Sequence, residues 1–239
     1  MLLRDYLRWP GGLLRVLRFK LLPGGPVVHR SEEAGDAGDL PGPVPDADPL
    51  VQLVSDGVGD LLHRHYSVVV DRPRRTPEGL MDRFAEDPNC AVPDVAVFAR
   101  TRGGPGPLAL GDEYRILILG PWDGPVRVVG MTPTAVRLAT LSGHLEAGQI
   151  EFRASSERGP AGEPDAALRF TIESWARSGD RVSRLLYDWL PLAKEIQLTV
   201  WAQTCAAMAA LAGGELRDGV TAHTRRVPAD LVARPPAGV

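Results

Sequence analysis

One turn of the sequence places a histidine and a glutamate two residues apart. His144 and Glu146 lie between Gly143 and Gly148, in the phrase that joins two alternating apolar segments. An imidazole has an unperturbed pKa near ~6.5, which suits His144 to moving a proton at neutral pH. Glu146 could orient that ring or act as a second acid or base. These two residues are therefore the candidate catalytic pair.

The same turn also fits a structural role. In that interpretation, the side chain of His144 or Glu146 bonds to backbone amides and holds the hairpin, while the two glycines supply left-handed backbone. Isolated histidines in turns are usually structural or solvated. Both interpretations stay open at the level of the sequence.

The elements that position this turn form an antiparallel meander. In two of them, apolar side chains share one face and charged side chains the other, as Phe152 and Phe170 do against Arg153 and Arg169. One face of the sheet is therefore expected on a core and the other in solvent. Alternation and intervening turn residues predict five strands, over residues 113–119, 126–131, 135–141, 149–155 and 167–176.

Shorter elements precede the meander. A strand is predicted over residues 65–71, and residues 95–100 fit a further strand or a short helix. Between them, Thr76 as N-cap and Pro77 at the first helical position predict a helix, which Pro88 ends.

A long helix follows the last strand and closes the domain. It is capped by Ser178 or Asp180, is kinked or restarted by Pro191, and ends at the pair Gly213-Gly214. A sheet with one apolar face and a long apolar helix after it should pack together. The predicted fold class is therefore α+β, of the helix-grip type: a curled antiparallel sheet wrapped around a long C-terminal helix.

The topology also predicts where polar groups gather. Alternate turns of a meander fall at the same end of the sheet, so Trp122 and Asp123 should share an end with His144. The fifth strand runs toward that end, which brings the start of the long helix and Arg181 there too. The helix dipole and Arg181 would favour an anionic or carbonyl oxygen at this mouth.

Four more side chains are candidates for lining a cavity between helix and sheet. Each would place a hydrogen-bonding group on an apolar wall, and packing in a solid core is the alternative interpretation of each. They are Tyr66, Tyr114, Gln197 and Trp201. Together with Trp122, Asp123 and Arg181 they form the predicted ligand-binding set.

Composition limits the class of protein. A net charge of -3 argues against nucleic acid as a partner. Cys90 and Cys205 lie far apart, without metal-ligand spacing or a disulfide framework, which is typical of a reducing cytoplasm. The sequence holds no phosphate loop, dinucleotide fingerprint, Cys-x-x-Cys or Gly-x-Ser-x-Gly phrase, so we expect no cofactor and no metal.

Changes in composition predict four segments. Residues 1–22 are basic and amphipathic, and residues 23–49 form a Pro/Gly-rich, acidic linker. Residues 50–213 form the helix-grip domain, and residues 214–239 a loose tail that could add one short element. The linker should be mobile or draped on the surface, because it cannot bury enough apolar area to offset its ordering entropy.

The first segment has two interpretations. Its arginines could hold an anionic membrane surface, with apolar side chains between them. Alternatively it packs on the domain as an extra helix, because Pro10-Gly11-Gly12 divides it into short pieces. Arginines interrupt its apolar stretch, so it does not fit a signal peptide.

Four phrases in this order resemble one branch of the START-like superfamily called SRPBCC. They begin at Gly111, Gly120, Thr140 and Arg169, with the sequences GDEY, GPWDGPVRV, TLSGHLEAG and RFTIES. The similarity covers residues 57–211, and the branch occurs in bacteria and plants as a domain of unknown function. It implies a helix-grip fold with a cavity between helix and sheet. The branch brings no agreed catalytic residues, and only the Gly-His-x-Glu-x-Gly turn is mapped onto a site.

Three functions follow as hypotheses. Related branches bind lipids, hormones and polyketides, so the first is a cytoplasmic protein that binds a small apolar or amphipathic molecule. The second is a cofactor-free cyclase or dehydratase of polyketide-like metabolism, with His144 and Glu146 transferring protons. The third is a peripheral membrane or interaction module that uses residues 1–22.

Overall fold

The fold is built on one curled sheet of nine strands. The computed structural model describes residues 26–93, 96–118, 124–159, 162–163, 166–179 and 191–232. The strand order is β1-β9-β2-β8-β7-β6-β5-β4-β3, and only the β1–β9 pair is parallel. The strands are β1 (Val28–Ala34), β2 (Val58–Asp71), β3 (Ala96–Arg102), β4 (Glu113–Ile118), β5 (Gly124–Thr132), β6 (Ala135–Thr140), β7 (Glu146–Glu157), β8 (Ala167–Ser178) and β9 (Glu215–Val227).

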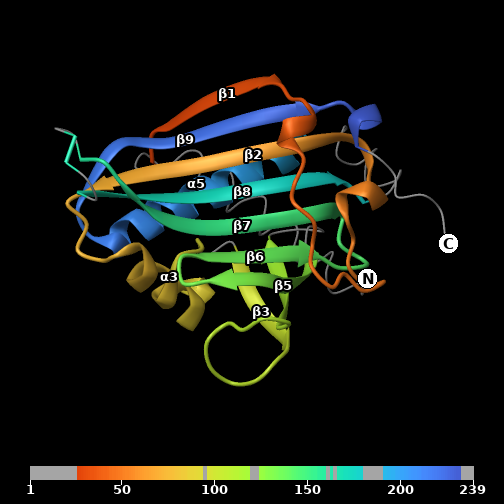
Figure 1. Cartoon of the computed structure of the whole chain (residues 1–239), viewed down its shortest axis with the longest axis horizontal. Coiled ribbons are helices and arrows are strands. Elements are labelled where there is room, and N and C mark those ends of the chain that lie inside the picture. Colours follow the sequence, from red (N-terminus) through yellow and green to blue (C-terminus); the bar gives the residue numbers. More distant parts are fainter. Residues whose placement is uncertain are drawn as a thin grey trace.

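In the described part of the chain, the α-helices α3 (Pro77–Glu86) and α5 (Pro191–Ala212) cover one face of this sheet, which we call the inner face. α5 packs on β2, β8 and β9, whereas α3 packs on β6 and β7 and touches α5. Figure 1 shows α5 behind β2 and β8, with the sheet across it. The predicted helix-grip fold is therefore confirmed. The described residues also contain short 3-10 helices at Ala37–Asp39, Val54–Asp56, Pro88–Cys90 and Ala229–Leu231.

Local sequence signals account for α3 and for the meander. The Thr76 hydroxyl accepts a hydrogen bond from the Gly79 amide at 3.2 Å, and Pro77 occupies the first turn, as predicted. Residues 95–100 fitted a strand or a short helix, and those that the structure describes, 96–100, belong to β3. The five meander strands follow in the predicted order.

Aromatic side chains fill the centre of the space between helices and sheet. Phe152, fully buried on β7, lies 5.0 Å from Phe84 and 5.8 Å from Trp201 between ring centroids. Phe98 stands 6.4 Å from both Phe84 and Phe152, with its ring steeply inclined to each. Offset and edge-on rings at these distances attract each other beyond the area that they bury. Among the residues that the structure describes, aromatic rings therefore fill the middle of the inner face.

The segment predicted as a linker, residues 23–49, contains a strand of the sheet. Val28–Ala34 forms edge strand β1, and the segment after it crosses the outer face toward β6, as the orange chain in Figure 1 shows. Its acidic residues bond to arginines of the sheet: Asp48 lies 2.7 Å from Arg127, and Asp39 3.2 Å from Arg225. Partly or fully buried apolar side chains add two small outer clusters, with Leu40, Val44, Val51, Leu53 and Val54 among their members. The acidic side chains thus hold this segment on the sheet through ion pairs. Of the two predicted alternatives, mobile or draped on the surface, the second describes it.

The predicted tail was wrong in the same way. Residues 215–227 form β9, which pairs with β2 on one side and with β1 on the other. Val220 and Ala222 face the core, while Thr221 and His223 alternate to the outer face. A register shift opposite Val68 and the Asp218-Gly219 turn interrupt the alternation, which hid a long strand in the sequence.

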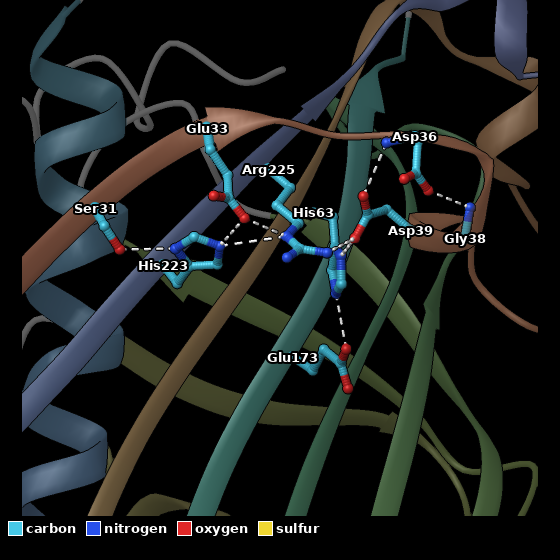
Figure 2. A network of polar contacts seen from close by, with 9 residues as sticks. All are labelled: Ser31, Glu33, Asp36, Gly38, Asp39, His63, Glu173, His223 and Arg225. Carbon is cyan, nitrogen blue, oxygen red and sulfur yellow. Dashed lines mark hydrogen bonds and ion pairs between the residues drawn. The ribbon is translucent and has the colours of Figure 1, made fainter.

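A polar network on the outer face joins the first strand to the sheet (Figure 2). The ring of His63 donates from Nδ1 to Asp39 at 3.0 Å and from Nε2 to Glu173 at 2.7 Å. It also stacks on Trp175, 5.2 Å away and 9° from parallel. Burial alone would lower the pKa of His63, but the bonds to Glu173 and Asp39 outweigh it and raise that pKa. The ring is therefore held as an imidazolium between two carboxylates.

His63→Gln is expected to destabilise the protein most at mildly acid pH. The folded-state pKa of His63 lies above its unfolded value, so its contribution is complete below about pH 6.5 and is lost as pH rises through the folded pKa. Two charge-assisted bonds contribute about 2 kcal/mol. Denaturant unfolding of wild type and variant between pH 5.5 and 9 should show a free-energy gap that narrows with rising pH.

Wild type and variant must be compared because other histidines change the pH dependence of the unfolding free energy in the opposite direction. Burial lowers the pKa values of His65 and His144, so their contributions fall as pH drops below the unfolded value. The His144 term cancels in the difference between wild type and His63→Gln, whereas the His65 term cancels only in part, because the charge of His63 helps to lower the pKa of His65. A gap that stays constant from pH 5.5 to 9 would contradict the imidazolium assignment.

In the part of the chain that the structure describes, no helix is both long and apolar enough to span a bilayer. The basic segment over residues 1–22 lies outside the described residues.

Candidate functional site

The turn between β6 and β7 holds His144 against its own backbone. The His144 amide donates to the Leu141 carbonyl at 3.0 Å, and the ring nitrogen Nδ1 accepts from the Glu146 amide at 2.9 Å. Burial lowers the pKa of His144, so the ring is neutral near pH 7 and carries its proton on Nε2. Gly143 and Gly148 have φ angles of 94° and 157°. The turn thus shows the hydrogen bond and the left-handed glycines of the structural interpretation.

The His144 ring also lies against the start of β5. A Cβ atom added to Gly124 would stand 1.9 Å from the ring carbon Cδ2, so the glycine leaves the space that the ring occupies. Gly124 directly follows Trp122 and Asp123 in the sequence, which are predicted to lie in a turn. Those two residues and Arg181 lie outside the described residues, so their predicted place at this mouth stays a prediction.

The side chain of Glu146 contacts a glutamine and an arginine. Its carboxylate accepts from the Gln197 amide of α5 at 3.1 Å and lies 3.8 Å from the Arg64 guanidinium of β2. Arg64 in turn donates to the Gln197 side-chain oxygen at 2.8 Å. The predicted residues Glu146 and Gln197 are thus brought together, and Arg64 joins them. Only 6% of the surface of Arg64 is exposed, so its positive charge is buried beside Glu146 and Gln197.

A pocket opens beside Arg64, between α5 and the β2–β9–β1 side of the sheet. Its volume is about 280 Å³. The lining residues of this Arg64 pocket are Arg30, Ser31, Glu32, Leu62, Arg64, Tyr66, Leu198, Ala222, Thr224 and Arg226. Strand register places Tyr66 opposite Ala222 and Arg64 opposite Thr224, and Ala222 in turn opposite Arg30.

The residues of the pocket differ in burial, from an inner floor to an exposed, charged rim. Arg64, Tyr66 and Ala222 are buried and form the floor, while Arg30 and Arg226 are exposed. At the rim, Arg226 is 3.2 Å from Glu32 across the β9–β1 pair. Three arginines and one glutamate therefore surround a small space that also has apolar walls. Such a space suits a molecule with an apolar body and a negative group.

The other predicted lining residues lie elsewhere. Tyr114 is buried on β4, where its hydroxyl accepts from Arg100 at 2.8 Å and its ring packs edge-on against Phe98. Trp201 belongs to the central aromatic core, next to Phe152. The bonded hydroxyl of Tyr114 fits core packing, whereas the buried indole nitrogen Nε1 of Trp201 has no hydrogen-bond partner among the described residues. Their role as lining residues stays a prediction, and Tyr66 lines the Arg64 pocket.

The sequence reasoning missed the arginines of this site. Arg64 alternates with Tyr66 and Val68 on the inner face of β2, and a charge on an apolar face is a signal that could have been found. It was passed over because the predicted strand began at residue 65. Arg30 and Arg226 were missed with the two strands that carry them.

Solved structures similar to this chain share little of its sequence. A truncated norcoclaurine synthase from Thalictrum flavum has 10% identity and a TM-score of 0.39, over 64% of this chain and 95% of that one. The major latex-like protein from Panax ginseng has 15% identity and a TM-score of 0.36, over 64% and 99%. Protein Ms6760 from Mycobacterium smegmatis has 12% identity and a TM-score of 0.38, over 62% and 92%.

These similarities are too low to assign a function. No protein-family model matches the sequence, and no curated protein is significantly similar to it. What the chain does must therefore be argued from its own geometry.

Proposed function

We propose that this protein binds a small amphipathic molecule in the Arg64 pocket. The observation that carries the proposal is the pocket itself, which combines an apolar wall from α5 and β2 with arginines at its floor and rim. A preformed concave space with few polar groups on an apolar wall is typical of ligand sites.

The size of the pocket limits the ligand. A volume of 280 Å³ lies just below the usual range of ligand pockets and equals roughly nine waters of liquid. The ligand would therefore have on the order of ten non-hydrogen atoms. Leu62, Leu198 and Ala222 would contact its apolar part.

A melting experiment with eight-carbon probes tests the proposal. A ligand that binds only the folded state stabilises it, by about 1.4 kcal/mol at ten times its Kd. For a chain of this size we expect at least one of octanoate, 1-octanol and octylamine to raise the melting temperature by about 4 °C. Differential scanning fluorimetry over a concentration series measures this shift.

A variant that fills the pocket is the control. Ala222→Leu adds bulk at the buried floor and should abolish the shift, whereas Leu216→Phe changes an exposed side chain of the same strand and should keep it. If no probe shifts the melting temperature of wild type, or if Ala222→Leu retains the full shift, the pocket is not the binding site.

The remaining hypotheses stay proposals. Proton transfer by His144 and Glu146 rests on residue types, because the two side chains bond to different partners in the folded chain. Membership of the bacterial and plant SRPBCC branch rests on the four sequence phrases. A cytoplasmic location and membrane contact through residues 1–22 are likewise proposals from composition.

A further inference from the structure

The floor of the Arg64 pocket contains a hydroxyl that the chain leaves without a partner. Tyr66 is 3% exposed and packs in the main core, yet it lines the pocket. Its hydroxyl makes no hydrogen bond with any residue that the structure describes. The hydroxyl opens on the pocket, so an acceptor atom of a ligand could take its hydrogen bond there in place of water.

This hydroxyl is a donor at any physiological pH. Burial raises the pKa of Tyr66 to about 12, so the phenol keeps its proton. Arg64 lies two residues before Tyr66 on the same face of β2, so the Cα atoms of the two residues are about 7 Å apart. A hydroxyl donor and a guanidinium at this spacing can face one small acceptor group from two sides.

The charges of the pocket favour a single negative group. Arg30, Arg64 and Arg226 oppose Glu32 among the lining residues, and Glu146 lies behind Arg64. Asp60 lies 3.8 Å from Arg226, so Glu146 and Asp60 balance the arginines from outside the lining. Among the lining residues themselves, three arginines face one glutamate. A monoanion suits this lining, whereas a second buried negative charge would have no cation left to pair with it.

We infer that the Arg64 pocket recognises an organic carboxylate, whose oxygens accept from the Tyr66 hydroxyl and face Arg64. The apolar part of the acid lies along Leu198 and Leu62 toward the rim. This inference rests on the proposed function and specifies its ligand class. Medium-chain or small aromatic carboxylic acids fit the pocket volume.

Calorimetric titration with three probes and two tyrosine variants tests the inference. Wild type should bind octanoate at least tenfold more tightly than 1-octanol and octylamine. Tyr66→Phe removes one oxygen and keeps the ring, so it should fold, melt at the same or a slightly higher temperature, and weaken octanoate binding about tenfold. Tyr114→Phe, in a buried tyrosine bonded to Arg100 outside the pocket, should leave octanoate binding unchanged.

The outcomes separate the inference from the proposed function. If 1-octanol or octylamine binds as tightly as octanoate, or if Tyr66→Phe binds octanoate like wild type, the carboxylate assignment is overturned and the amphipathic pocket stands. If none of the three probes binds to wild type, the proposed function itself fails. Arg64→Lys adds a further arm: it keeps the charge but loses the planar fork, and its octanoate affinity should fall several-fold.

Discussion

Gly148→Ala is expected to lower the free energy of unfolding by about 4 kcal/mol and the melting temperature by about 10 °C. Two effects add at this position. The backbone φ of 157° is costly for any residue with a side chain, by about 1–2 kcal/mol. A Cβ atom would also stand 1.8 Å from the Trp175 carbonyl oxygen on the neighbouring strand β8, so the strands must move apart. Urea unfolding of the purified variant measures the loss.

The other glycine of the same turn is the matched control. Gly143 has a φ of 94°, but nothing lies within 4 Å of the place where its Cβ would stand. Gly143→Ala should therefore show the strain alone, about 1–2 kcal/mol. Equal losses in the two variants would mean that the strands separate without cost, and the account of the close approach would be wrong.

The contrast between these glycines shows how far the sequence reaches into the site. Two glycines around His144 predict left-handed backbone in a turn, because few other residues adopt it. The approach of Gly148 to Trp175 depends on how β7 and β8 pair, which involves residues 27 apart in the sequence. Spacing within a turn does not contain that information.

The same distinction explains the fold. The meander and α3 could be predicted because alternation, turn residues and a helix cap act over a few neighbouring residues. Strands β1 and β9 were missed, since β1 pairs in parallel with a strand almost two hundred positions away. Their partners stabilise them, and the side chains of Glu33 and Arg225, one from each strand, form an ion pair at 2.7 Å.

The candidate site combines both cases. The prediction placed Glu146 in the turn at one end of the sheet and Gln197 on the wall of a cavity, and the structure brings the two within hydrogen-bonding distance. The pocket lies beside them rather than in the middle of the helix–sheet space. Its position depends on the volumes of aromatic side chains that meet from several elements, and strand counting does not supply those volumes.

Phe152→Ala is expected to lower the free energy of unfolding by about 3–5 kcal/mol. Phe152 is fully buried on β7 and meets Phe84, Phe98 and Trp201 from α3, β3 and α5. Truncation removes transfer free energy and leaves a cavity, because three elements would have to shift to close it. Phe152→Leu keeps most of the volume and should lose about half as much. Arg153→Ala, exposed on the opposite face of the same strand, should change the unfolding free energy by less than about 1 kcal/mol.

The same variant decides whether the core and the Arg64 pocket are separate spaces. Phe152 does not line that pocket, and the rings around it fill the centre of the inner face. Folded Phe152→Ala protein should therefore bind octanoate with the affinity of wild type, at a temperature well below its melting point. A large gain for longer acids would mean that the new cavity joins the pocket. In that case the aromatic core, and not the Arg64 floor alone, would set the length of ligand that the protein accepts.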